Sequence, residues 1–340
     1  MMDKEMKSTL KDLVSIPGPP GQEGQVRAYV QSRVEPLVDQ LEVDALGNLI
    51  VRLEGREAGG PLIMISAHLD EIGLTATHID QKGFVRFSNL GGVYPEYLPG
   101  GRVRFLNGTR GVIHAEGEGK RSRVPPLKKM YIDVGAASGE DHPVQVGDPA
   151  VFEGAFQDLG GRLVSKALDD RVGVALLISL IRRMSSASPP AVPLAFVFTV
   201  REEVPRKGAG PAAFHVQPDL ALAVDVTSTG DTPRGGSMEV SLGKGPAVKI
   251  RDKYMLADPA VVQWMTGRAE KEGLPYQREI LEKGSTEAAP VQISRSGVPA
   301  GGLCLPCRYV HSPSEMIDEG DMIQALDLLE SLLRNPPALK

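Results

Sequence analysis

The sequence has few cysteines, few aromatic residues and no long hydrophobic run. Two cysteines among 340 residues cannot form a framework of several disulfides, so a reducing compartment is the expected environment. The longest apolar runs, such as VGVALLISLI from Val172, have about ten residues, whereas a membrane-spanning helix needs about 20. The first residues, MMDKEMKSTLKDL, carry charges where a signal peptide has an apolar core. We therefore expect a cytoplasmic protein that contacts no membrane.

Charge of either sign is present, but the balance is slightly acidic, with a net charge of −5 at pH 7. A bulk basic face for nucleic acid is therefore not expected. The hydrophobic fraction of 41% and the charged fraction of 24% are typical of a globular protein. At roughly 150 residues per domain, the length predicts about two domains.

The order of helical and strand patterns predicts an α/β domain that is interrupted by a β-rich insertion. The run PLIMISA, Pro61–Ala67, is apolar without alternation, which is typical of a strand buried on both faces of a parallel sheet. From Leu74 to Leu163 the sequence changes to short alternating segments separated by glycine-rich turns. Helices and strands alternate again after Ala167. We assign residues 1–71 and 164–340 to the α/β domain and residues 72–163 to the insertion.

A histidine and an aspartate follow the buried strand as His68-Leu69-Asp70. Residues two apart on a strand point the same way, and a histidine ligand commonly donates its second ring N–H to a carboxylate. His68 could therefore bind a metal with Asp70 behind it. The alternative is a strand-end histidine that only pairs with a local carboxylate. The same spacing in His78-Ile79-Asp80 lies in an alternating segment, and we expect that copy at the surface.

Other acidic residues and histidines lie in or beside segments that we expect to be helices or buried strands. Each has an ordinary structural explanation of its own, such as a helix cap. These are Asp169 and Asp170 before a helix, Glu202 and Glu203 after the strand Pro193–Val200, Asp225 inside LALAVDV, and His311 in RYVHSPSE. In open α/β sheets, sites form beyond the carboxyl ends of the strands, so these side chains are expected to converge. Two histidines and three carboxylates can hold two divalent ions when one carboxylate bridges, which leaves one carboxylate as a base.

With these motifs in place, the sequence resembles one family closely. SAHLDEIGL, SKALDDRVG, FTVREEVPRKGA, AVDVTSTGD and RYVHSPSE occur in the order found in the tetrahedral aminopeptidases. These are dinuclear metallo-aminopeptidases that include glutamyl aminopeptidases, and some members were once labelled endoglucanases. The resemblance extends over nearly the whole chain, including SIPGPPGQEG, DALGNL, KKMYIDVGAASGED and LGKGPAVKIRD.

The resemblance implies a role for each site residue and two divalent metal ions per chain. The implied ligands are His68 and Asp225 for one ion, Glu203 and His311 for the other, and Asp169 as the bridge. Glu202 would be the general base that activates a metal-bridging water, and Asp70 would orient His68. The Asp169–Asp170 peptide is cis in related enzymes. Zinc is the first candidate, with cobalt and manganese as alternatives, because the same nitrogen and oxygen donors accept all three.

The resemblance also implies a fold and an assembly. The fold is a zinc-peptidase-like α/β/α sandwich with a mixed sheet, and the insertion is a small barrel-like or PDZ-like β-rich dimerisation domain. Family members assemble from dimers into a hollow dodecamer. Because the insertion begins and ends beside His68 and Asp169, we expect that it can be removed without cutting the ligand set.

Two positions depart from the family pattern. Pro205 replaces the usual glycine after Glu-Glu-Val. KGSTEAAP stands where Gly-Gly-Thr-Asp-Ala is common, which places Glu287 at an aspartate position. Glu287 is a candidate for binding the α-ammonium group of the substrate, and the alternative is a solvated loop glutamate.

The leading hypothesis is an aminopeptidase that removes the N-terminal residue of peptides. A dinuclear deacylase or carboxypeptidase of related fold is the main alternative, but its insertion is usually an α/β lid. A catalytically silent metal-binding scaffold should have lost a ligand or the base, and none is missing. A glycan hydrolase usually needs aromatic sugar platforms, and aromatic residues make up only 5% of this chain.

Overall fold

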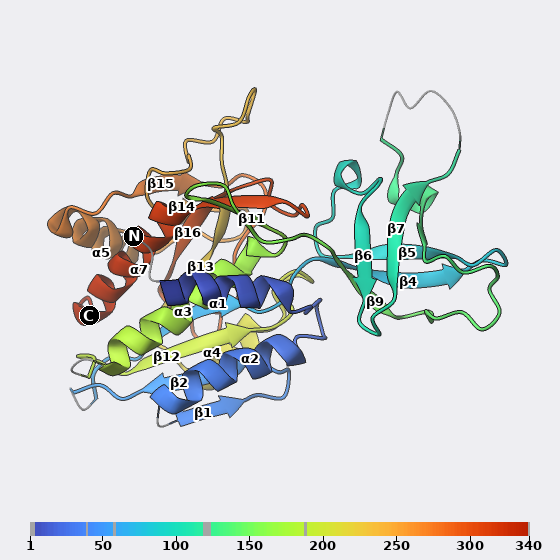
Figure 1. Ribbon diagram of the computed structural model, residues 1–340. Helices are drawn as coiled ribbons and strands as arrows, with labels where there is room; N and C mark the ends of the chain where they lie inside the picture. The colour runs from blue at the N-terminus through green and yellow to red at the C-terminus, as the bar shows by residue number, and fades with distance from the viewer. Residues whose placement is uncertain (1–3, 39, 57–58, 118–123, 187–188, 339–340) are drawn as a thin grey trace.

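The computed structural model describes residues 4–38, 40–56, 59–117, 124–186 and 189–338. These residues form a large α/β domain and a smaller β-barrel that projects from it (Figure 1). No helix in the described ranges is long and apolar enough to cross a membrane.

The large domain is built on an 11-stranded mixed sheet. Its strands are β1 (Gln40–Val43), β2 (Leu49–Leu53), β3 (Ile63–His68), β10 (Gln157–Asp158), β11 (Arg162–Ser165), β12 (Leu194–Thr199), β13 (Leu220–Ser228), β14 (Ala247–Arg251), β15 (Gln277–Ile280), β16 (Ala300–Arg308) and β17 (Glu315–Asp318). The strand order is β1-β2-β12-β3-β13-β16-β17-β11-β10, with β14 and β15 branching from β16. The central strands β12, β3, β13 and β16 are parallel, so their carboxyl ends meet at one edge.

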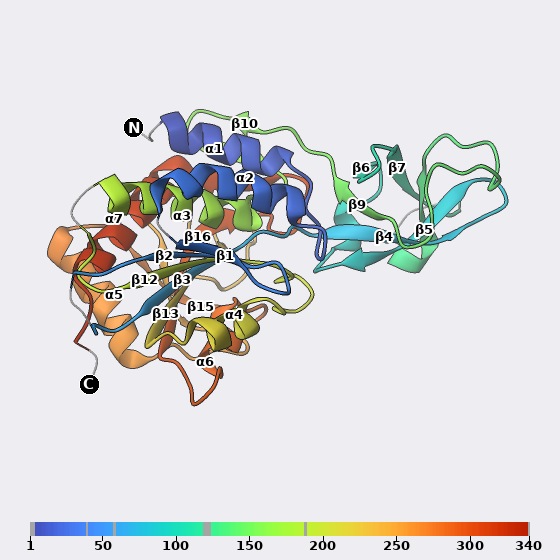
Figure 2. The same cartoon turned by 90° about the horizontal axis from the view of Figure 1, so that it is seen from below.

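Helices cover both faces of this sheet, as expected for an α/β/α sandwich (Figure 2). They are α1 (Lys4–Ser15), α2 (Gly24–Val34), α3 (Leu168–Ser186), α4 (Ala209–Val216), α5 (Pro259–Glu272), α6 (Ala288–Gln292) and α7 (Glu319–Arg334). The larger hydrophobic core lies under α1, α2, α3 and α7, and a second core lies under α4 and α6. Every residue of β3 and β12 is buried. This burial on two faces explains why the run that forms β3 is apolar without alternation.

The inserted domain is a closed antiparallel barrel of six strands in the order β4-β5-β8-β7-β6-β9. The strands are β4 (Gly73–Ile79), β5 (Phe84–Leu90), β6 (Arg102–Phe105), β7 (Arg110–Ala115), β8 (Met130–Asp133) and β9 (Pro149–Phe152). Alternate residues such as Val103 and Phe105 point inward, and this produces the alternating sequence pattern. His78 is exposed on β4, as expected, and a register shift between Ala76 and His78 turns it away from the side of the buried Leu74 and Ala76.

The barrel ends earlier than the sequence pattern suggests. Its last strand ends at Phe152, whereas β10 and β11 pair within the large sheet through β17. The predicted boundary at residue 163 therefore assigns β10 and part of β11 to the insertion, although both lie in the α/β domain. Short strands at a sheet edge have the same half-exposed pattern as barrel strands, so the sequence does not distinguish them.

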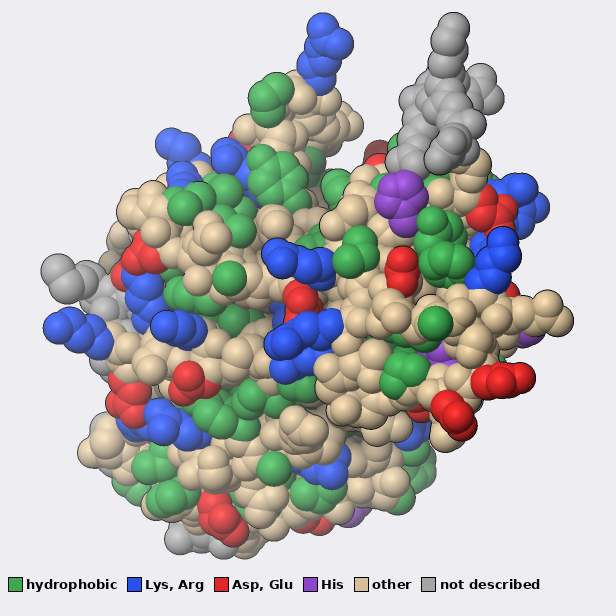
Figure 3. Space-filling model, turned by 45° about the vertical axis from the view of Figure 1, so that its right-hand side comes forward, with side chains coloured by type: hydrophobic (Ala, Val, Ile, Leu, Met, Phe, Trp, Pro, Cys, Tyr) green, Lys and Arg blue, Asp and Glu red, His purple; other side chains and the backbone are tan. Residues whose placement is uncertain are grey.

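Acidic and basic side chains are interspersed on the face shown in Figure 3. Hydrophobic side chains lie among them in small groups, which is ordinary for a protein surface.

Candidate metal centre and active site

The site lies at the carboxyl edge of the parallel strands. His68 is the last residue of β3, Asp225 lies on β13, and Glu202 and Glu203 follow β12. His311 lies in the connection between β16 and β17. Asp169 stands in the first turn of α3, where it departs from helical geometry with ψ of 108°. The Asp169–Asp170 peptide bond is cis, as the resemblance implies.

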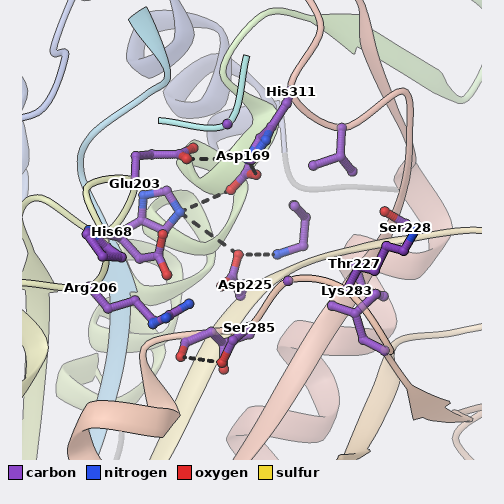
Figure 4. Close-up of a pocket in the computed structure, with 18 of the residues that line it drawn as sticks. His68, Asp169, Glu203, Arg206, Asp225, Thr227, Ser228, Lys283, Ser285 and His311 are labelled. Atoms are coloured by element: carbon purple, nitrogen blue, oxygen red, sulfur yellow. Dashed lines mark hydrogen bonds and ion pairs between the residues drawn. The ribbon is translucent and has the colours of Figure 1, made fainter. Parts of the chain in front are cut away.

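These residues form two groups of metal-ligand atoms that share one carboxylate. His68, Asp169 and Asp225 have their ligand atoms within 4.8 Å of one another, and so do Asp169, Glu203 and His311. The two oxygens of Asp169 face different histidines. Oδ1 is 3.0 Å from Nε2 of His68, and Oδ2 is 3.3 Å from Nε2 of His311 (Figure 4).

Asp70 connects His68 to the two glutamates. Nδ1 of His68 lies 3.1 Å from the Asp70 carbonyl oxygen and 3.5 Å from its carboxylate. The same carboxylate accepts hydrogen bonds from the backbone N–H groups of Glu202 at 2.9 Å and Glu203 at 3.1 Å. Asp70 therefore fixes both the imidazole and the turn that presents Glu202 and Glu203.

Glu315 holds the backbone of the other group. Its carboxylate accepts the N–H of Asp169 at 3.0 Å and the N–H of His311 at 2.8 Å. Asp170 acts similarly on His68, whose N–H donates to Oδ2 of Asp170 at 3.2 Å. No role was predicted for Glu315, although it lies four residues after His311 in the motif RYVHSPSE. An acidic residue so close to a candidate ligand could have indicated a supporting role.

The buried acids and histidines of the site shift one another's pKa values. Burial raises the pKa of Glu202 well above its ordinary value, and the charges of Asp225 and Glu203 add to this effect. Burial by itself lowers the pKa of His311, but Glu203 and Asp169 outweigh burial and raise the pKa to about 12. Without metal the histidines therefore supply the positive charge. No lysine or arginine in the described part of the chain forms an ion pair with Asp169, Glu203 or Asp225.

Two carboxylate oxygens also lack a partner. Oε1 of Glu202 and Oε1 of Glu203 are buried and accept no hydrogen bond from any described residue. A buried anionic oxygen without a partner is unfavourable unless a cation or a donor occupies the space beside it. Imidazole nitrogen and carboxylate oxygen are the donors that zinc and related divalent ions take in proteins. The residues present therefore fit divalent metal ions.

A cavity of about 270 Å³ opens onto the candidate ligands. His68, Asp169, Glu202, Glu203, Asp225 and His311 all reach its wall. Toward the other side of the cavity the wall carries Arg206, Ser285 and Lys283 (Figure 4). A small chemical group in the cavity can therefore reach the candidate ligands.

Glu287 does not reach this cavity. Its side chain is 1% exposed and accepts a hydrogen bond from the hydroxyl of Thr199, while its neighbours Ser285 and Thr286 form the wall. It is not the solvated loop residue considered as the alternative. A direct contact between Glu287 and substrate has no support in this geometry, because the loop turns its side chain inward.

The inserted domain contributes to the same cavity. Gly92 and Tyr94, which follow β5, line the wall beside His311. The candidate ligands all lie outside residues 72–163, but removal of the insertion would take this part of the wall away. The contact could not be predicted from local sequence, because it joins segments more than 200 residues apart.

The two cysteines, Cys304 and Cys307, are free and buried on β16.

Comparisons with known proteins identify the family. The M42 glutamyl aminopeptidase family matches residues 47–328. The lysyl aminopeptidase of Pyrococcus furiosus is 30% identical over 98% of this chain and 97% of its own length. The aminopeptidase APDkam598 of Desulfurococcus kamchatkensis is 37% identical, with a TM-score of 0.93 over 98% of this chain and 95% of its own. The TET1 peptidase of Pyrococcus horikoshii is 32% identical, with a TM-score of 0.88 over 97% of this chain and 100% of its own.

The family match spans every candidate ligand from His68 to His311, and the solved relatives superpose over both domains. The resemblance noted in the sequence is thereby confirmed, and the chain belongs to the M42 glutamyl aminopeptidase family of peptide-bond hydrolases.

Proposed function

We propose that this chain removes the N-terminal residue of peptides with two divalent metal ions that share Asp169. The carrying observation is the orientation of Asp169, whose two oxygens face His68 at 3.0 Å and His311 at 3.3 Å. One ion would be held by His68 and Asp225, and the other by Glu203 and His311. Such ions polarise a scissile carbonyl and lower the pKa of the attacking water.

Glu202 is the proposed general base. Its carboxylate lies at the cavity wall, and its Oε1 has no hydrogen-bond partner among the described residues. It can therefore accept a proton from water and pass it to the leaving amine. Asp70 supports this step, because it holds the backbone N–H of Glu202 at 2.9 Å.

Recognition of the N-terminus needs an anion near the reacting bond. The α-ammonium group of a peptide carries a positive charge, and the carboxylates that reach the cavity can bind it. With the α-ammonium group held beside the proposed metal ions, the first peptide bond of the substrate would lie next to them. This favours removal of one residue over cleavage within a chain.

Arg206 and Lys283 support a preference for an acidic N-terminal side chain. Both line the cavity, and neither forms an ion pair with an acid within the ranges that the structure describes. The guanidinium of Arg206 stacks on the ring of Tyr254 at 4.8 Å, which holds it in place. A glutamyl or aspartyl side chain would give these cations a partner.

Two observations support self-association of this chain: a relative that forms closed shells and the small core of the inserted barrel. The TET1 peptidase of Pyrococcus horikoshii can assemble into a tetrahedron or a large octahedral shell. The barrel has a small core of its own, and pairing with a second copy would stabilise it further. We propose that the barrel forms a dimer contact and that dimers build a dodecamer. Twelve chains of 36.4 kDa would weigh about 437 kDa by light scattering, and a monomer at micromolar concentration contradicts the proposal.

The test of function is an assay of the metal-loaded protein over aminoacyl p-nitroanilides of Glu, Asp, Leu and Lys, with N-acetylated copies as controls. Zinc, cobalt and manganese are each used for loading, since the donor set accepts all three. We expect release from free N-termini only, and faster release from Glu and Asp. Equal hydrolysis of N-acetylated substrates contradicts an aminopeptidase, and the fastest release from Lys contradicts the proposed role of Arg206 and Lys283. We further propose a cytoplasmic location, in keeping with two free buried thiols.

A further inference from the structure

One segment of the inserted barrel lies against the metal centre of the other domain. After β5 the chain runs through Gly91 and Gly92 to Tyr94 and then a short turn at Pro95–Tyr97. Figure 4 shows the turquoise ribbon of the inserted domain passing beside His311 and Glu203. The ring of Tyr94 lies 6.1 Å from the ring of His311. The barrel therefore supplies part of the active-site wall.

The backbone at Gly92 leaves no room for a side chain. A Cβ atom on Gly92 would lie 2.5 Å from Nδ1 and 2.7 Å from Cε1 of His311. Real Cβ atoms do not approach other atoms this closely, so His311 or the segment would have to move. Gly92 does not have the left-handed backbone that favours glycine, so the obstacle is contact with His311 alone.

The imidazole of His311 is thus held from two sides. Its Nε2 faces Asp169 and Glu203, each at 3.3 Å, and its Nδ1 faces Gly92. Its backbone N–H donates to Glu315 at 2.8 Å. The barrel segment therefore leaves the ring no room to move away from the carboxylates toward Gly92.

The segment itself is fixed locally. The carbonyl oxygen of Gly91 accepts a hydrogen bond from Nδ2 of Asn89 at 2.7 Å and from the N–H of Val93 at 3.1 Å. A Cβ on Gly91 would lie 3.0 Å from Oε2 of Glu203, so the second ligand of the same group also touches this segment.

We propose that Gly92 is a positioning residue, through which the inserted barrel sets the affinity of the metal ion held by Glu203 and His311. The inference rests on the proposed two-ion site. It gives the barrel a role within the active site of its own chain, separate from any role in association between chains. Groups that orient metal ligands typically change metal affinity by about 10–100-fold when they are altered.

The experiment compares Gly92→Ala with Gly236→Ala in zinc titrations against a chromogenic chelator. Gly236 is the matched control, because a Cβ there meets no atom within 4 Å and its backbone suits alanine. We expect Gly92→Ala to weaken one of the two zinc ions at least ~10-fold and to leave the other unchanged, as the affected ligands belong to one group. The melting temperature of the metal-free protein, recorded for each variant, reports folding separately from metal binding.

The zinc titrations distinguish failure of the proposed function from failure of the role of Gly92. If the unaltered protein binds fewer than two ions, the proposed function fails. If it binds two and Gly92→Ala binds both as tightly as Gly236→Ala does, the positioning role of Gly92 is overturned. Should Gly92→Ala fail to fold, Asn89→Ala decides, because Asn89 is exposed and its loss removes one of the two hydrogen bonds to the Gly91 carbonyl. A several-fold weaker ion in Asn89→Ala supports the inference, and unchanged affinity for both ions contradicts it.

Discussion

Charged side chains are exposed and paired on the inserted barrel, whereas in the metal centre acidic side chains are buried and grouped together. On the barrel, Arg110 and Glu153 form an ion pair in which the arginine side chain is 71% exposed, above a core of hydrophobic side chains. In the metal centre, Asp169, Glu203 and Asp225 are close together and nearly inaccessible, and within the described residues their only ion-pair partners are histidines. Exposed pairs contribute about 0–1 kcal/mol, whereas grouped buried acids are unfavourable unless cations join them. The comparison indicates that the centre is organised for binding cations and not for stability.

The largest effect is expected for Asp169→Ala. Loss of the shared carboxylate removes a ligand from both groups and the negative charge between two cations. Their mutual repulsion should then expel at least one ion, and activity should fall to background. Metal analysis of the purified variant measures this directly. Two tightly bound ions in Asp169→Ala would show that the carboxylate does not bridge.

Glu202→Gln distinguishes the role of general base from the role of metal ligand. The amide keeps the shape of the side chain but cannot accept a proton, so kcat should fall by about 10²–10⁴-fold. Metal content should remain at two ions per chain, because Glu202 is not a proposed ligand. Glu153→Gln on the barrel is the control for the same chemical change at the surface. Near-normal turnover in Glu202→Gln excludes Glu202 as the base.

Metal affinity should depend steeply on pH at the centre. Without metal, the carboxylates beside His311 raise its pKa to about 12, and burial raises the pKa of Asp225 well above its ordinary value. His311 therefore holds a proton near neutral pH, and a metal must displace it. Zinc affinity should fall at least ~10-fold between pH 8 and pH 6, with proton release measurable by calorimetry in buffers of different ionisation enthalpy. An affinity that does not change over this range contradicts a site that is protonated without metal.

The smallest effect is expected on the barrel surface. Arg110→Ala removes an exposed ion pair with Glu153, and the free energy of unfolding should change by less than about 1 kcal/mol. Metal content and kcat should not change. Chemical denaturation of the metal-free protein measures the stability. A loss of several kcal/mol would mean that surface charge supports the barrel, and the contrast with the metal centre would weaken.

The local pattern of apolar and polar residues was enough to predict the buried strands and the inserted β-rich domain. The continuous apolar runs of β3, β12 and β13 correctly predicted strands buried on both faces, and short alternating segments predicted the barrel. The two copies of the His-x-Asp spacing were also distinguished. His68 ends a fully buried strand and reaches the cavity, whereas His78 lies on the half-exposed β4 and is exposed.

Long-range contacts could not be predicted in the same way. Nothing local to Gly92 indicates that it touches His311, because the contact depends on how two domains pack. Glu287 has the sequence surroundings of a loop residue, yet the turn before α6 buries its side chain against Thr199. The hairpin of β1 and β2 was missed because its outer strand is short and mostly exposed.

The most direct test of the two-ion centre is anomalous diffraction at the zinc absorption edge from crystals of the zinc-loaded protein. We expect two peaks per chain on either side of the Asp169 carboxylate, one beside His68 and Asp225 and the other beside Glu203 and His311. A single peak, or two peaks that do not share Asp169, would contradict the proposed two-ion centre.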